Sequence, residues 1–199
     1  MEHGRTAVSP PGRILTHEEW SSQIQDWHYL GSRCRGVIFS WGHSEGCCVF
    51  TNPRSREISK WFPELIVQEL ARMVGKPNHM WAMSSLMSDS IKECKRRGWD
   101  ILITYADPSN SNTGSVYRAA NWIPFGESTR ERVWYLDDIR VSRRSMYDKH
   151  GTQSVPAMKV IYGDRLRFVE GFPKPRFIYG VSRKGRKFIT NPSFQPPPS

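Results

Sequence analysis

The sequence predicts a folded α/β domain built around a mixed sheet, and three observations lead to this class. Apolar residues make up 38% of the 199 residues and charged residues 24%, a balance that suits a chain with a hydrophobic core. Apolar side chains recur at three- and four-residue steps from Met80 to Cys94, which predicts an amphipathic helix. The short apolar run Ile101–Tyr105 follows as a buried strand. A strand–helix–strand succession of this kind implies a mixed sheet.

The N-terminal part is expected to contribute a helix and a hairpin. Thr16 followed by Glu19 has the spacing of a capping box, which opens a helix. Two strands are expected at 36–41 and 46–51, joined by a turn-rich segment.

Further elements follow along the chain. The apolar run at 64–74 fits either a helix or a strand, and the break at 75–78 ends it. A polar loop at 107–114 leads to a short helix at 115–120. Additional strands are expected at 123–125, 132–136, 160–169 and 176–181.

The four cysteines indicate neither disulfides nor a metal site. No two of them form a Cys-x-x-Cys pair, so we expect no structural zinc and reduced thiols. Adjacent cysteines on a strand point to opposite faces, which is expected of Cys47 and Cys48. No apolar stretch is long enough to span a bilayer, and the N-terminus has no apolar signal-peptide core, so we expect no membrane association.

The positive charge gathers in the last third of the chain. Residues 130–199 hold 15 Lys and Arg against 6 Asp and Glu, whereas residues 1–129 hold 14 against 13. This asymmetry suggests a polyanionic partner such as nucleic acid. The alternative is a basic surface that serves solubility alone.

The segment from the strand at 101–105 to Trp122 carries a family resemblance. Its short helix reads Val116-Tyr117-Arg118-Ala119-Ala120-Asn121-Trp122. This resembles the Leu-Tyr-x-x-x-Gly-Phe helix of the GNAT family of acyl-CoA-dependent N-acyltransferases. Asn121 replaces the glycine, and asparagine also accepts a positive φ. The resemblance implies a GNAT-like splayed mixed sheet with flanking helices, and acetyl-CoA or another acyl-CoA as cofactor.

Shorter pieces narrow the resemblance to the Mom-like branch of phage DNA-modification proteins, over about residues 17 to 180. They are His28-Tyr29, Glu69-Leu70-Ala71-Arg72, Tyr105-Ala106-Asp107-Pro108-Ser109 and Lys174-Pro175-Arg176-Phe177-Ile178-Tyr179. The branch implies DNA as partner and the cytoplasm of the infected bacterial host as location. The oligomeric state is left open.

The resemblance also implies catalytic roles. Tyr117 matches the family tyrosine that protonates the leaving sulfur. Asp107 would bind the acceptor amine or remove its proton, and Ser109 would assist. The alternatives are a packing tyrosine, an aspartate that caps an Asx-turn, and a capping serine.

Donor binding is expected of Arg72, Asn78 and His79. The glycine-rich pyrophosphate loop of typical GNAT proteins is missing before the long helix, whose N-terminal N–H groups can still bind phosphate. Arg72 could instead form a structural ion pair with Glu69 or Asp107. His28 and Tyr29 are a further candidate site, with packing as the alternative.

Nucleic-acid binding is expected of Arg143, Arg144, Lys174 and Arg176, which alternate with aromatic residues. A base inside a duplex must be flipped out before an enzyme can act on it. The basic run at 183–187 is either part of this surface or a solvated tail.

The domain hypothesis has a flexible arm at 1–15, a GNAT-like domain at 16–182 with basic C-terminal strands, and a basic, proline-rich tail at 183–199. The functional hypothesis is acyl transfer to a DNA base, with an aminomethylated deoxyuridine preferred and adenine N6 as the alternative. Two rivals are acetylation of a protein, tRNA or small amine, and a non-catalytic scaffold that binds DNA.

Overall fold

The chain folds into two compact units, which are described separately. In the computed structural model, the described residues are 9–29, 31, 34–55, 57–108, 111–141 and 143–194. The first unit comprises the chain up to Gly126 and from Pro175 onward, and the second comprises Glu127–Lys174. Residues 16–182, expected as one domain, are therefore divided between both units.

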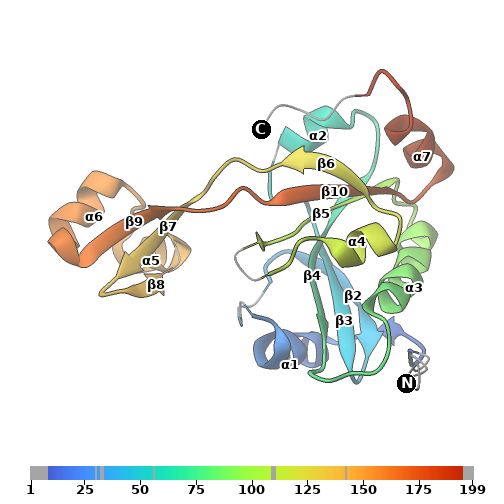
Figure 1. Ribbon diagram of the computed structural model, residues 1–199, viewed down its shortest axis with the longest axis horizontal. Coiled ribbons are helices and arrows are strands. Elements are labelled where there is room, and N and C mark those ends of the chain that lie inside the picture. The colour runs from blue at the N-terminus through green and yellow to red at the C-terminus, as the bar shows by residue number, and fades with distance from the viewer. Residues whose placement is uncertain are drawn as a thin grey trace, which may run out of the picture. The chain divides into compact units, whose positions relative to one another are not determined.

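The first unit is built on a seven-stranded mixed sheet with the order β1-β2-β3-β4-β5-β10-β6 (Figure 1). β4 and β5 run parallel, whereas the pairs β1–β2, β2–β3, β3–β4 and β5–β10 are antiparallel. The run at 64–74 is thus resolved as a strand. The strands are β1 Arg13–Ile14, β2 Val37–His43, β3 Gly46–Thr51, β4 Val67–Gly75, β5 Ile101–Tyr105, β6 Ile123–Glu127 and β10 Pro175–Gly180.

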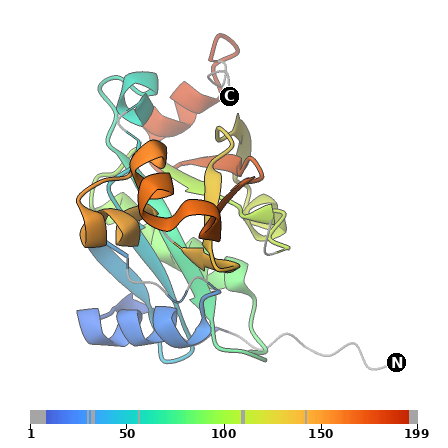
Figure 2. The same ribbon diagram turned by 90° about the vertical axis from the view of Figure 1, so that its left-hand side faces the viewer.

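Helices cover both faces of this sheet. α1 lies on one face and α3 on the other (Figure 1), and Figure 2 looks onto the face that carries α1. The predicted capping box is present, because the Glu19 amide donates to Thr16 Oγ1 and the Thr16 amide donates to the Glu19 carboxylate. The helices are α1 His17–Trp27, α2 Glu57–Trp61, α3 Met83–Arg96, α4 Ser115–Ala119 and α7 Arg183–Ile189.

The core follows from the alternation of side chains along the strands. Cys48 belongs to the apolar cluster beneath α3, and Cys47 belongs to the cluster beneath α1. The prediction that these two side chains lie on opposite faces is confirmed. Asn121 adopts φ 60, so the replacement of the family glycine keeps the left-handed turn after α4.

The second unit has a three-stranded antiparallel sheet of its own, in the order β8-β7-β9. Trp134, Met146, Met158 and Leu166 form its buried core. The prediction of a strand at 160–169 is wrong for 160–165, which belong to a helix and a 3₁₀ turn. The strand begins at Leu166. The elements are β7 Arg132–Leu136, β8 Ile139–Val141, α5 Arg143–His150, α6 Val155–Tyr162, η2 Gly163–Arg165 and β9 Leu166–Glu170.

Two segments within the expected arm and tail form regular structure. Arg13 and Ile14 pair with β2, and 183–189 form helix α7 against the first unit. Gly185 allows this close approach, because a Cβ there would lie 2.0 Å from the Asp100 carbonyl oxygen. The proline run 196–198 lies outside the described residues. Within the part of the chain that is described, no helix has the length and apolar character needed to cross a bilayer.

Candidate active site

The sheet of the first unit opens between its two parallel strands. β4 and β5 pair at three positions, from Val67 opposite Ile101 to Glu69 opposite Ile103. Beyond them β4 stays paired with β3, and β5 stays paired with β10. A shift in the β3–β4 register leaves Ala71 as an extra residue, a β-bulge that bends β4. The result is the splayed mixed sheet that the sequence predicted.

A threonine marks the point where the two strands separate. Thr104 is 1% exposed, and its hydroxyl donates to the Leu70 carbonyl at 2.9 Å, across the gap between the strands. The Thr104 hydroxyl oxygen also lies 3.4 Å from the hydroxyl oxygen of Tyr117. Thr104 is not among the residues that the sequence indicated for the site. Its signal is a hydroxyl residue inside the otherwise apolar strand 101–105.

Tyr117 reaches this point from helix α4. Gly114 precedes the helix at φ 79, and a Cβ there would lie 2.4 Å from the Phe177 ring, so the position requires glycine. The Tyr117 side chain is 5% exposed and packs between Trp122 and Phe177. Burial raises the pKa of its hydroxyl, which therefore keeps its proton at neutral pH. The ring packs as a core residue does, while the hydroxyl meets Thr104 at the opening of the sheet.

Asp107 lies two residues beyond the end of β5 and accepts a hydrogen bond from a tyrosine that is far away in the sequence. Its side chain is buried, and the Tyr29 hydroxyl donates to its Oδ2 at 3.2 Å. Burial, followed by the charge of Asp107, raises the pKa of Tyr29 to about 12, so this donor stays protonated. Ser109, the third predicted catalytic residue, lies outside the described residues.

His28 completes this side of the site. Its ring stacks on the Tyr29 ring with 4.4 Å between centroids. Burial and the nearby charge of Arg72 lower the pKa of His28 to about 4, and Asp107 acts in the opposite sense. The imidazole is therefore neutral at pH 7. The structure thus joins the pair His28-Tyr29 to Asp107.

Arg72 follows the bulge in β4 and lies close enough to His28 and the two tyrosines for its charge to act on them. Its charge acts on His28, Tyr29 and Tyr117. Its Nη1 donates to the Ala71 carbonyl at 2.7 Å, and its buried Nε has no hydrogen-bond partner. No described carboxylate forms an ion pair with Arg72.

Glu69, the carboxylate on β4 that the sequence offered as a partner for Arg72, pairs with a different arginine. Arg54 lies 3.5 Å from Glu69, and its backbone amide donates to the same carboxylate. The alternative of an Arg72 ion pair with Glu69 or Asp107 is therefore absent from the described residues. A partly buried guanidinium with spare donors is available for an anionic ligand.

The loop between β4 and α3 holds the other predicted donor-binding residues. Asn78 adopts φ 63, and His79 stacks on Trp81 with its Nδ1 2.7 Å from the Trp81 carbonyl oxygen. Because a carbonyl oxygen only accepts, that contact makes Nδ1 the donor. Ala82 is the N-cap residue of α3 and offers no side-chain acceptor, so the first amides of the helix receive no side-chain cap from this position.

The residues expected to bind nucleic acid are not all on one unit. Arg143 and Lys174 belong to the second unit, where Arg143 is exposed and Lys174 lies 3.8 Å from Glu131. Arg176 belongs to the first unit, is 5% exposed, and stacks on Trp61 at 4.5 Å. Its burial does not favour contact with DNA phosphates. Helix α5 includes Arg144, whose side chain lies outside the described residues.

The mixed sheet, opened between β4 and β5 and flanked by helices, is the α/β arrangement that the family resemblance implied. The chain belongs to the Mom protein family, which its sequence matches over residues 13–198. A search of curated proteins gives no match.

Solved structures with a similar arrangement include two acetyltransferases. One is a Bacillus subtilis acetyltransferase in complex with CoA, at 10% identity and a TM-score of 0.46, covering 85% of this chain and 97% of that chain. The other is the GNAT family N-acetyltransferase YhbS from Escherichia coli in complex with CoA, at 10% identity and a TM-score of 0.47, covering 92% and 88%.

Proposed function

We propose that the protein is a phage DNA-modification enzyme that transfers an acetyl group, or another acyl group, from acyl-CoA to an amino group on a DNA base. The observation that supports this proposal is the meeting of Tyr117, Asp107 and Arg72 around the opening between β4 and β5. An acid, a carboxylate and a cation without an ion-pair partner are the groups that acyl transfer to an amine uses. The family resemblance supplies the DNA context and the location in the infected host cell.

The residues at the opening fit an acyl-CoA donor. Bound there, the donor would supply an activated carbonyl attached to a good thiol leaving group. Arg72 offers spare guanidinium donors for its phosphates or its carbonyl. The uncapped N-terminus of α3 offers backbone amides, which replace the missing glycine-rich loop as a phosphate site. Asn78 and His79 lie in the loop that leads into this helix.

Asp107 and Tyr117 divide the proton transfers between them. Asp107 orients the acceptor amine and takes the proton that the nitrogen loses as the C–N bond forms. Tyr29 holds the carboxylate in place through its hydroxyl. Tyr117 gives its proton to the sulfur as the C–S bond breaks. Its raised pKa ensures that the proton is present at neutral pH.

The acceptor we favour is a primary alkylamine on a hypermodified base, such as 5-aminomethyl-deoxyuridine. The lone pair of an alkylamine is localised on nitrogen, whereas that of adenine N6 is delocalised into the ring. An acid–base pair such as Tyr117 and Asp107 suffices for the first acceptor. Adenine N6 is the alternative acceptor.

Mass spectrometry of nucleosides tests the proposal directly. DNA with aminomethylated or ordinary bases is incubated with the full chain and acetyl-CoA, then digested. We expect a gain of one acetyl group on the aminated nucleoside. A gain of one acetyl group on deoxyadenosine would instead identify adenine N6 as the acceptor. No gain on any base, with acetylated small amines instead, would overturn it.

A further inference from the structure

The second unit contains an open hollow of about 620 Å³ that the catalytic proposal leaves unused. Its walls come from β7, β9, the starts of α5 and α6 and the chain that precedes β7. They carry the arginines Arg130, Arg132 and Arg143, the aromatic residues Trp134 and Phe168, and the carboxylates Glu131 and Glu170. All of these residues belong to the same compact unit, so the hollow is a property of that unit alone.

Two of the arginines have no carboxylate partner within the described part of the chain. Arg130 pairs with Glu170 at 3.3 Å, but no described carboxylate pairs with Arg132 or Arg143. Instead, the Arg132 guanidinium lies 5.7 Å from the Phe168 ring, and that of Arg143 lies 5.7 Å from the Trp134 ring. Guanidinium groups held on aromatic rings keep their N–H donors for an anion.

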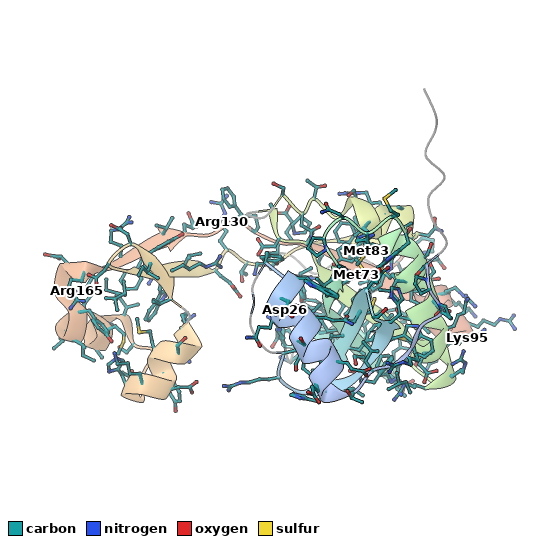
Figure 3. The ribbon with its side chains drawn as sticks, turned by 90° about the horizontal axis from the view of Figure 1, so that it is seen from below. Asp26, Met73, Met83, Lys95, Arg130 and Arg165 are labelled. Atoms are coloured by element: carbon teal, nitrogen blue, oxygen red, sulfur yellow. The ribbon has the colours of Figure 1, made fainter. Side chains whose placement is uncertain are left out.

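Arginines elsewhere in the unit are different. Arg165 and Arg167 also belong to the second unit, and each is bonded to an aspartate, Asp137 and Asp138 respectively. Arg165 and Arg130 lie at opposite ends of the unit (Figure 3). Positive charge that is not already neutralised is thus available at the hollow.

A buried aromatic residue also lines the hollow. Trp134 is 2% exposed, and its ring packs edge-on against Phe168. Phe168 and Val155 give the hollow an apolar wall beside the arginines.

We propose that this hollow binds one nucleotide of a DNA strand, with its phosphate between Arg132 and Arg143 and its sugar and base against Phe168 and Val155. The inference rests on the proposed function, because that function makes DNA the substrate. Cations that hold a phosphate and an aromatic ring that contacts the base are the combination by which proteins bind single-stranded or unstacked DNA. CoA also contains a nucleotide, so the test distinguishes the two sources.

The test measures binding of a labelled single-stranded oligodeoxynucleotide to the full chain by fluorescence anisotropy over a range of salt concentrations. We expect the double variant Arg132→Gln, Arg143→Gln to raise the Kd on the order of tenfold and to reduce the salt slope by about 1.4. The matched control Arg165→Gln, Arg167→Gln removes two arginines that aspartates already neutralise, and it should stay within about twofold of the wild type.

Two further variants keep the test decisive. Arg132→Lys with Arg143→Lys preserves the two positive charges. This double variant should therefore keep most of the wild-type salt slope, which the glutamine variant loses. Phe168→Leu should weaken binding of a normal strand more than binding of a strand with abasic sites, because only the former offers a base to the ring.

The inference would be overturned if the double variant of Arg132 and Arg143 bound DNA with the same affinity as the control variant of Arg165 and Arg167. A loss confined to CoA binding, measured by calorimetry in the same variants, would also overturn it, because the hollow would then hold the donor. The binding assay contains no acyl donor and needs no turnover. Its result therefore stands apart from the mass spectrometry that decides the proposed function.

Discussion

The two units differ in where they keep their polar chemistry. In the first unit, Tyr117 and Asp107 are nearly buried. In the second unit, arginines line an open hollow or pair with exposed aspartates. Burial suits proton transfer, since it holds a phenol protonated and strengthens each interaction. Exposure suits a polyanion, since binding then proceeds by release of counterions. The two proposals accordingly place catalysis in the first unit and DNA binding in the second.

The largest expected effect tests the catalytic half of this comparison. Replacing Tyr117 with phenylalanine removes the hydroxyl at the opening of the sheet and leaves the packed ring in place. We expect the rate of acyl transfer to fall by about 10²–10⁴-fold, the range for a lost general acid. Single-turnover nucleoside mass spectrometry measures this rate.

Tyr179→Phe is the matched control, because Tyr179 packs on Trp122 in the same core. Its rate should remain close to that of the wild type. Equal rates in the two variants would remove Tyr117 from the mechanism.

The second prediction tests whether the units unfold separately. Leu166 is fully buried in the small core of the second unit. Replacing it with alanine should cost about 2–5 kcal/mol, because the surrounding side chains cannot fill the cavity. Hydrogen exchange should show lost protection in β7 and β9 and unchanged protection in β3 to β5. A loss of protection spread equally over both units would contradict the division.

The third prediction concerns pH and belongs to the first unit. Burial and Arg72 lower the pKa of His28 from 6.5 to about 4, so the unfolded chain binds this proton more readily than the folded chain between those values. Stability should therefore fall as the pH falls from about 6.5 to 4. The share due to His28 is about 1–2 kcal/mol after screening by solvent.

Urea unfolding at several pH values measures this share as the difference between the wild type and His28→Gln. The variant should lose less stability on acidification. An identical pH dependence would show that His28 titrates alike in the folded and unfolded chain.

The smallest expected effect concerns a helix end in the first unit. Thr16→Ala removes the side-chain acceptor of the Glu19 amide, and we expect a loss of about 1 kcal/mol in urea unfolding. Ser22→Ala on the same helix serves as the control, since Ser22 lies within the helix and caps nothing. A larger loss in the control would show that the capping box contributes little.

Features set by neighbouring residues were predictable from the sequence. The capping box at Thr16, the strand Ile101–Tyr105 and the left-handed turn at Asn121 each depend on a few adjacent side chains. The run at 64–74 was ambiguous because its periodicity fits two structures. Pairing with β3 and β5, which are distant in sequence, decided that it is a strand.

Features set by distant contacts were less predictable. The hydrogen bond between Tyr29 and Asp107 joins positions 78 residues apart, and only the family resemblance suggested that these residues share a site. Thr104 was missed because a lone hydroxyl in a strand has many roles. Arg176 was expected at a DNA surface, but pairing of β10 with β5 places it in the interior. The separate packing of 127–174 follows from contacts that no local pattern reveals.

The way the chain leaves the first unit has a consequence for protein engineering. β6 and β10 are neighbours in the sheet, and just beyond them the Ser128 amide donates to the Lys174 carbonyl at 2.9 Å. The second unit is therefore an insertion between two strands that are neighbours in the sheet, a position where an insertion disturbs the sheet little. A different insertion, or a short turn, could be grafted at this junction while the sheet of the first unit is retained.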